Sequence, residues 1–144
     1  MEPSEITFIT VLLLGILWNM WIRKREQERP KRIAVVEDSD DDFMMFKLFF
    51  HLDNVIIDRY KTADNLPLIF AKNKPDAVIA DYYLDGCIRG DQLIRLCDKF
   101  KIPSLLVTGG SQKIEGVPEQ RILRKSPDRE YFGRITEWAQ HQFA

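Results

Sequence analysis

The stretch Asp76-Ala77-Val78-Ile79-Ala80-Asp81 (DAVIAD) decides the fold that we expect for this chain. Four consecutive apolar residues are typical of a strand that is buried on both faces of a parallel sheet. Folds of this kind place their chemistry just beyond the carboxyl ends of the strands. We therefore take Asp81, the carboxylate at the end of this run, as the candidate active residue.

Three further apolar runs end in polar residues in the same way. They are Ile33–Val36 before Glu37 and Asp38, Ser104–Val107 before Thr108, and Ile122–Arg124 before Lys125. As parallel strands of one sheet, the four runs would bring three carboxylates, one hydroxyl and one ammonium group to a single edge. Each such residue alone is most often a turn former or a solvated charge, so the prediction depends on their joint occurrence in this order.

Helical patterns alternate with these runs. Helices are expected at 41–52, 63–72, 91–100 and 127–143. The last of them would have Ser126 as N-cap and Pro127 at its first position. A further strand is expected at 55–60. Residues 109–120 contain three glycines, one proline and no helical period, which predicts a loop. Alternating strands and helices imply right-handed crossovers. The predicted fold is α/β and doubly wound, with a five-stranded parallel sheet in the flavodoxin-like order 2-1-3-4-5.

The helix expected at 41–52 has more apolar residues than its core-facing stripe requires. Phe43, Phe46 and Phe50 recur at helical spacing, whereas Met44 and Leu48 fall outside the stripe. Scattered exposed apolar residues are ordinary on soluble domains. This pair is therefore either a harmless surface feature or a docking strip for a partner.

The N-terminal segment has the pattern of a membrane anchor. Ile6–Ile22 holds 17 residues without a charge, and a helix of that length spans roughly 25 Å, near the lower limit for a bilayer core of about 30 Å. Glu2 and Glu5 precede it and Arg23-Lys24-Arg25 follows, which is opposite to a secretory signal and places the C-terminal side in the cytoplasm. We predict a single-pass membrane protein anchored by residues 1–22. The alternative is a helix that packs on the domain or on another chain.

Length and composition allow one globular domain beyond this anchor. The chain has 144 residues, of which 45% are hydrophobic and 30% charged. Its 21 basic and 22 acidic residues give no general affinity for nucleic acid, so no nucleic-acid partner is expected. We divide the chain into the anchor, a basic juxtamembrane linker at 23–31 and a soluble domain at 32–144. Cys87 and Cys97 are too few for a disulfide framework and form no metal-binding pattern.

The three acids at the predicted sheet edge indicate a metal ion. Glu37, Asp38 and Asp81 would repel one another unless a cation lay among them, and Mg²⁺ prefers one or two carboxylates together with waters and phosphate oxygens. A carboxylate can accept a phosphoryl group if the charge on the phosphoryl oxygens is neutralised. Mg²⁺ and Lys125 would neutralise it, while the Thr108 hydroxyl donates a hydrogen bond. Asp81 is then the nucleophile.

These motifs resemble those of a known family. VVEDSDDD at 35–42, AVIADYYLDG at 77–86, LLVTGG at 105–110 and LRKSP at 123–127 are similar to the motifs of response-regulator receiver domains, over essentially all of 31–144. The resemblance implies that Asp81 is the phosphoacceptor and that Mg²⁺ is bound by Glu37, Asp38, Asp81 and the backbone carbonyl of Tyr83. It also implies a histidine kinase or a histidine phosphotransfer protein as partner, and a second copy of the chain, as a homodimer, is a further candidate.

Three features depart from the family pattern. Ile122 stands where the family usually has an aromatic residue that swings inward on phosphorylation. The 16 residues 109–124 must also supply the fifth strand, so the fourth helix of the domain is expected to be shortened or absent. Ser126 stands where the family prefers a cis-proline, and a cis bond to another residue costs about 3 kcal/mol. These departures argue against the usual output face and leave phosphorylation as the expected chemistry.

Two functions follow from the resemblance. The first is a membrane-tethered single-domain receiver that takes a phosphoryl group on Asp81 and signals through altered protein contacts, with no enzymatic activity other than self-catalysed phosphorylation and dephosphorylation. The second is a degenerate receiver that acts at the membrane as a phosphorylation-independent interaction module. A haloacid-dehalogenase-type phosphatase is set aside, because it requires a second Asp where this chain has Tyr83.

Overall fold

A computed structural model describes residues 3–144 and divides into two compact units, one ending at Pro30 and the other covering Lys31–Ala144. The first unit is a single helix, α1 (Pro3–Glu28). From Glu5 to Glu28 this helix is long and apolar enough to cross a membrane, and its most apolar window is not buried by other parts of the chain. Residues 1 and 2 of the predicted anchor lie outside the described residues.

Polar side chains within α1 bond to the helix itself. The Thr10 hydroxyl donates to the Ile6 carbonyl at 2.8 Å, and the Asn19 side-chain amide donates to the Gly15 carbonyl at 3.0 Å. Such bonds satisfy polar groups that would otherwise be costly in hydrocarbon. The two polar residues are therefore compatible with a membrane-spanning helix.

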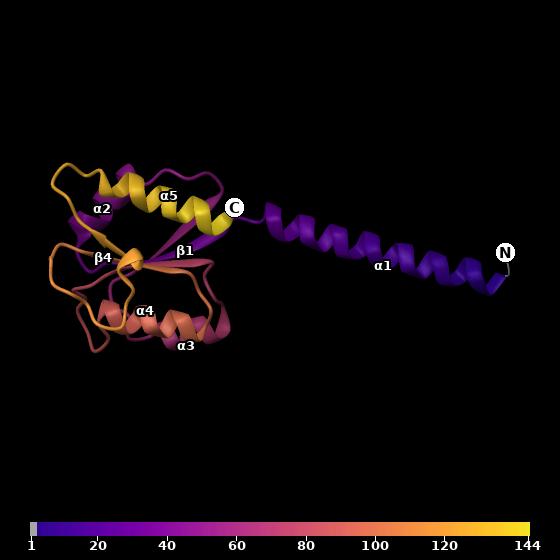
Figure 1. The fold of residues 1–144 in the computed structure, drawn as a ribbon, viewed down its shortest axis with the longest axis horizontal. Helices are drawn as coiled ribbons and strands as arrows, with labels where there is room; N and C mark the ends of the chain where they lie inside the picture. Colours follow the sequence, from indigo (N-terminus) through magenta and orange to yellow (C-terminus); the bar gives the residue numbers. More distant parts are fainter. Residues whose placement is uncertain (1–2) are drawn as a thin grey trace. The chain divides into compact units, whose positions relative to one another are not determined.

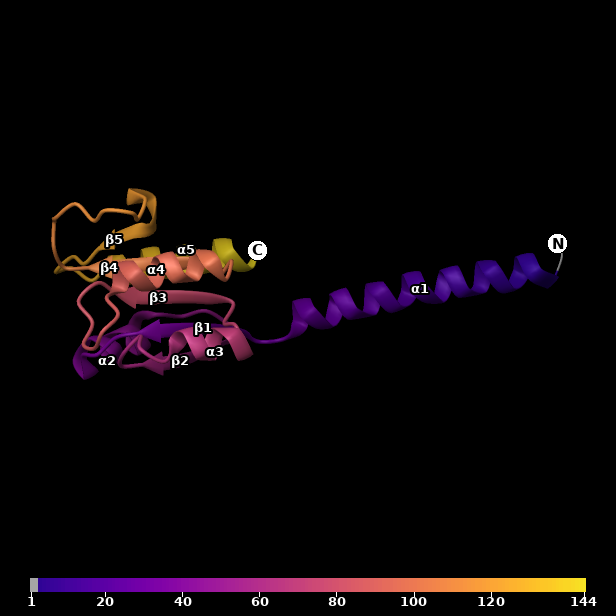
Figure 2. The ribbon, with the colours of Figure 1, turned by 90° about the horizontal axis from the view of Figure 1, so that it is seen from below.

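The second unit is built on a parallel sheet. Its strands are β1 (Lys31–Val36), β2 (Val55–Tyr60), β3 (Ala77–Asp81), β4 (Ser104–Thr108) and β5 (Ile122–Arg124). All neighbouring pairs are parallel, in the order β2-β1-β3-β4-β5 (Figure 2). The predicted topology is confirmed. Every strand ends at the same edge, which is where the predicted site residues follow.

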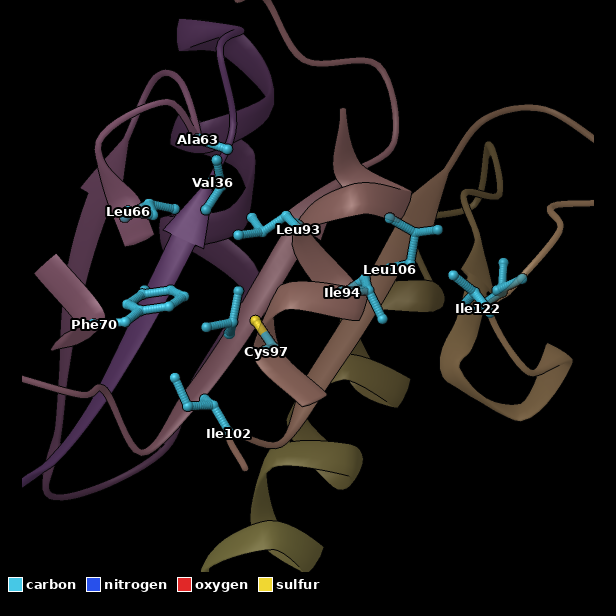
Figure 3. Close-up of a cluster of buried hydrophobic side chains, with 14 of the residues drawn as sticks. Val36, Ala63, Leu66, Phe70, Leu93, Ile94, Cys97, Ile102, Leu106 and Ile122 are labelled. Atoms are coloured by element: carbon cyan, nitrogen blue, oxygen red, sulfur yellow. The ribbon is translucent and has the colours of Figure 1, made fainter. Parts of the chain in front are cut away.

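Helices cover both faces of the sheet. They are α2 (Asp40–Phe49) and α5 (Tyr131–Phe143) on one face, and α3 (Leu66–Lys72) and α4 (Gly90–Lys99) on the other (Figure 1). Each face has its own apolar core. The core under α3 and α4 includes Leu66, Phe70, Leu93, Ile94 and Cys97 (Figure 3), and the core under α2 and α5 includes Phe46, Phe50, Phe132, Ile135 and Ala139. The two cores hold the sheet rigid beneath its carboxyl edge.

The last helix begins later than the sequence predicts. We expected it to start at Pro127 with Ser126 as N-cap, but α5 starts at Tyr131. The Ser126 hydroxyl instead donates to the Asp128 carboxylate at 2.5 Å, and Arg129 adopts a left-handed backbone with φ of +63°. A left-handed residue cannot continue a helix, so residues 126–130 form turns before α5. Residues 3–144 contain no cis peptide bond, and the Lys125–Ser126 bond is therefore trans.

The segment between β4 and β5 contains only one short helical turn in the structure, the 3-10 helix η1 (Glu119–Arg121). The expectation that the domain's fourth helix is shortened or absent is confirmed. Ile114 and Val117 from this loop are buried in the core on the α3 and α4 side of the sheet. Arg95 of α4 holds the loop by donating to the Glu115 carbonyl at 3.1 Å.

Candidate functional site

Three carboxylates meet at the carboxyl edge of the sheet. Glu37 and Asp38 directly follow β1, and Asp81 is the last residue of β3. Because β1 and β3 are neighbours, with Val36 paired to Ala80, these acids come together. One oxygen atom from each lies within 4.8 Å of the others, which is the spacing of a group able to hold a metal ion.

Two of these acids are buried, and burial raises the pKa of both. The side chains of Glu37 and Asp81 are 11% and 8% exposed. Burial raises the pKa of Glu37 to about 7, with Lys125 opposing the shift and Asp81 adding to it. Burial also raises the pKa of Asp81, opposed by Lys125 and by the backbone N–H of Tyr83. Both shifts reflect negative charge gathered in a place with little water.

The oxygens of Asp81 have different surroundings. Oδ2 accepts a hydrogen bond from the Tyr83 backbone N–H at 3.0 Å. Oδ1 is buried and accepts no well-directed hydrogen bond from any residue in 3–144, although it forms an ion pair with Lys125. The Lys125 ammonium at 3.2 Å is the positive charge that faces this buried oxygen, and a carboxylate oxygen can accept from a further partner as well. Three hard oxygen donors beside such an atom fit Mg²⁺.

Lys125 brings a positive charge into this cluster. It follows β5, and its backbone N–H donates to the Thr108 carbonyl at 2.9 Å. Its Nζ lies 3.2 Å from Asp81 Oδ1 and 3.6 Å from Glu37 Oε2. Burial lowers the pKa of Lys125, but the hydrogen bond to Asp42 and the nearby carboxylates raise it overall, so the ammonium remains charged.

Asp42 is a site neighbour that the sequence analysis missed. Its Oδ2 accepts from Lys125 Nζ at 2.8 Å, which is shorter than either of the other carboxylate contacts of this lysine. The sequence placed Asp42 in the first turn of a helix, where an acid is already explained by the helix dipole. Only the fold shows that this turn faces the lysine that follows β5.

Thr108 and Tyr83 lie at the same edge. Thr108 ends β4 and is fully buried, and its Oγ1 accepts from the Gly110 backbone N–H at 3.2 Å. This bond leaves the hydroxyl proton to be donated elsewhere. The ring of Tyr83 is exposed, and its hydroxyl accepts from the Gln112 side chain at 2.7 Å. Metal binding by the Tyr83 carbonyl stays a prediction.

Two further residues that the sequence analysis missed hold the loops of the site. The Arg59 guanidinium, from β2, donates to the carbonyls of Glu37 and Asp38 at 3.2 and 3.3 Å. The Asp64 carboxylate accepts from the backbone N–H groups of Cys87 and Ile88 at 2.9 and 3.1 Å, which fixes the loop after β3. Both residues act on backbone groups, and no sequence motif marks that role.

Gly90 allows α4 to begin against the end of β3. A Cβ atom at this position would collide with the Asp81 carbonyl oxygen and with Tyr82 Cα. The close approach of the two backbones therefore requires glycine. It helps to hold the Asp81 backbone in place from the side of the sheet opposite α2.

A small cavity lies beneath the acids. Its volume is about 30 Å³, and it is lined by Glu37, Asp42, Asp81 and Lys125 at its polar end and by Phe46, Tyr131 and other core residues at its apolar end. This volume is enough for about one water molecule. The charged groups therefore have some free space on the α2 and α5 side.

The structure is a doubly wound α/β domain with an acidic cluster at the carboxyl edge of its sheet, and solved structures with the same fold are similar to it. They include the signal receiver domain of an HD domain-containing protein from Pseudomonas fluorescens Pf-5, with a TM-score of 0.63 and 20% identity over 79% of this chain and 98% of that one. A CheY-like response regulator receiver domain protein from Methanospirillum hungatei JF-1 gives 0.61 and 18% over 78% and 95%. The receiver domain of the Francisella response regulator 1452 gives 0.59 and 12% over 78% and 96%.

Residues 31–144 thus have the fold of response-regulator receiver domains. No protein-family model matches the sequence, and no curated protein matches it. The likeness is therefore one of fold, and the function has to be inferred from the site.

Proposed function

We propose that this chain is a membrane-tethered receiver that accepts a phosphoryl group on Asp81 from a phosphohistidine of a histidine kinase or a histidine phosphotransfer protein. The observation that carries the proposal is Asp81 Oδ1. This oxygen is buried and lies 3.2 Å from the Lys125 ammonium, the group that would face the oxygens of the transferred phosphoryl group. A buried carboxylate oxygen beside a fixed positive charge suits phosphoryl transfer, because that charge can neutralise the oxygens of the transferred group.

In the proposed reaction, Asp81 Oδ1 attacks the phosphorus of the donor. A new O–P bond forms and the P–N bond of the phosphohistidine breaks, with its electron pair returning to the ring nitrogen. The donor phosphohistidine reacts with its other ring nitrogen already protonated, so the histidine leaves as neutral imidazole that keeps this proton. Lys125 neutralises negative charge on the phosphoryl oxygens, and the Thr108 hydroxyl donates to one of them.

Glu37, Asp38 and Asp81, with the carbonyl of Tyr83, would hold Mg²⁺ in this proposal. When bound, the ion would neutralise charge on the transferred group. Glu37 and Asp38 are held for this role by the bonds from Arg59 to their carbonyls. We assign the chain no reaction on another molecule; phosphorylation and hydrolysis at Asp81 would be self-catalysed, and the output would be a changed protein contact.

We further propose that α1 spans a membrane, with the receiver on the cytoplasmic side. The length and apolar character of the helix support this, as does the basic segment Arg23-Lys24-Arg25 that follows its uncharged run.

A second candidate is a receiver fold used as a constitutive interaction module. It is favoured by Ile122, which has no ring to report phosphorylation, and by the loop that replaces the fourth helix. The two functions differ in whether Asp81 is modified.

Incubation with acetyl phosphate and Mg²⁺, followed by intact-mass analysis, separates them. The first function predicts a phosphoryl adduct on the wild type that is absent from Asp81→Asn and is lost on treatment with hydroxylamine. The Asp41→Asn variant serves as a control, because it removes an exposed acid close to the site. An unmodified wild type, with Mg²⁺ binding intact, would favour the second function.

A further inference from the structure

The Lys125 ammonium is shared between the acceptor site and helix α2. It lies 2.8 Å from Asp42 Oδ2, 3.2 Å from Asp81 Oδ1 and 3.6 Å from Glu37 Oε2. Its shortest contact is therefore with Asp42, which is not part of the acid cluster of Glu37, Asp38 and Asp81. Asp42 belongs to the first turn of α2, where its backbone N–H donates to the capping Ser39 hydroxyl at 3.2 Å.

The partners of Lys125 differ in their access to water. The Asp42 side chain is 47% exposed, whereas that of Asp81 is 8% exposed. Water can replace the ammonium at Asp42 at little cost, because ion pairs at exposed positions are weak. Asp81 has no such substitute. The contact with Asp42 is thus the one that Lys125 can most easily give up.

The surroundings leave room for that movement. The cavity of about 30 Å³ is lined by Asp42, Asp81 and Lys125 together, so free space borders all three residues. A phosphoryl group on Asp81 would carry about two negative charges in place of one. Its attraction for the ammonium in this half-buried place would exceed that of a partly exposed carboxylate.

We propose that Asp42 is a positioning residue that holds Lys125 between α2 and the acceptor, and that phosphorylation of Asp81 draws Lys125 away from Asp42. The first turn of α2 then senses the phosphoryl group through the loss of this ion pair. Ile122 has no ring to swing inward on phosphorylation. In this proposal helix α2 transmits the change at Asp81 to the surface of the domain instead. The inference rests on the proposed function, since it requires that Asp81 can carry a phosphoryl group.

The test uses the full-length protein in detergent micelles with Mg²⁺ and beryllium fluoride, which mimics an acyl phosphate without hydrolysing. The side-chain carboxyl carbons of Asp41 and Asp42 are followed by ¹³C NMR. We expect the Asp42 signal to move toward the position of an unpaired aspartate when beryllium fluoride binds. The Asp41 signal should stay in place, because that residue is an exposed neighbour in the same turn.

Affinity for beryllium fluoride gives a second readout. The Asp42→Asn variant should bind beryllium fluoride about two- to fivefold more tightly than the wild type, because Lys125 then has no carboxylate at position 42 to leave. Asp41→Asn removes the same charge from the same turn and controls for the general effect of charge. Asp42→Glu restores a carboxylate and should return the affinity toward that of the wild type.

The outcomes separate the inference from the proposed function. A bound complex in which the Asp42 signal does not move, or in which Asp42→Asn and Asp41→Asn behave alike, would overturn the inference and leave the proposed function standing. Failure of the wild type to bind beryllium fluoride at all would overturn both.

Discussion

Lys125 Nζ lies 3.2 Å from Asp81 Oδ1, although strand β4 separates the strands from which the two residues come. The lysine reaches this position because its backbone extends the β5 ladder by one further bond, from its N–H to the Thr108 carbonyl. One ammonium group thus faces three carboxylates, those of Glu37, Asp81 and Asp42. Negative charge therefore exceeds positive charge around Lys125, and such an excess favours the binding of a cation.

Mg²⁺ should bind at the acid cluster and depend on Asp38. The Asp38→Ala variant should lose at least about tenfold in Mg²⁺ affinity, or about 1.4 kcal/mol, because one of three nearby oxygen donors is removed. Isothermal titration or NMR titration measures this change. Asp41→Asn, with an exposed carboxylate on the neighbouring turn, should bind as the wild type does. Equal affinities in wild type and Asp38→Ala would show that the metal site is elsewhere.

Stability of the metal-free domain should fall as the pH rises through neutrality. The folded-state pKa of Glu37 is raised by burial, to about 7 from an ordinary value of 4.5. Between these values the folded protein binds more protons than the unfolded chain does, so the free energy of unfolding decreases as the pH increases. We expect the free energy of unfolding to fall by about 1 to 3 kcal/mol between pH 5 and pH 8. The raised pKa of Asp81 contributes in the same direction.

Urea unfolding of a Lys31–Ala144 fragment at a series of pH values, followed by circular dichroism, measures this slope. Glu37→Gln should flatten it, because the glutamine cannot ionise. Mg²⁺ should restore stability mainly at the high-pH end, where the carboxylates are charged. A stability that rises over the same window would show that Glu37 ionises freely in the folded domain.

The anchor should hold the full-length protein in membranes. Because α1 carries an uncharged run followed by a basic cluster, the protein should pellet with membranes and resist extraction by high salt and by alkaline carbonate. A chain that begins at Lys31 should stay in the supernatant. Release of the full-length protein by salt alone would instead indicate electrostatic attachment to the membrane surface.

The sequence predicts the framework better than the details of the site. Buried strands such as β3 begin as continuous apolar runs, here residues 77–80, and their alternation with helices predicts a parallel, doubly wound sheet. The three acids could be placed together because each directly follows or ends a neighbouring strand. The Asp42 contact with Lys125 joins residues 83 positions apart and depends on how α2 is rotated. No local pattern records that rotation.

The start of α5 shows the same limit. Ser126 and Pro127 are favourable residues for the beginning of a helix, and local propensity alone places it there. The structure uses the Ser126 hydroxyl in a turn with Asp128 and places Arg129 in the left-handed region. The residue that follows strand β5, Lys125, must lie at the acid cluster before the chain turns back over the sheet. This tertiary requirement outweighs the local preference.

The exposed apolar pair on α2 should contribute to recognition of the phosphodonor. Met44 and Leu48 are 63% and 61% exposed, one helical turn apart, on the helix that begins beside the acid cluster. Transfer from a phosphohistidine protein requires docking, whereas acetyl phosphate has only to reach Asp81. The double variant Met44→Ser, Leu48→Ser should therefore slow transfer from a donor protein about tenfold, equivalent to 1 to 2 kcal/mol for a modest hot spot.

Labelling by acetyl phosphate should be unchanged in the same variant. Leu68→Ser is the matched control, because Leu68 is 69% exposed on α3, which covers the opposite face of the sheet. It should leave both reactions as they are in the wild type. Slowing of both reactions in the double variant would mean that the acceptor site itself was damaged. If neither reaction slows, the donor docks on another surface, and Met44 and Leu48 are ordinary exposed residues.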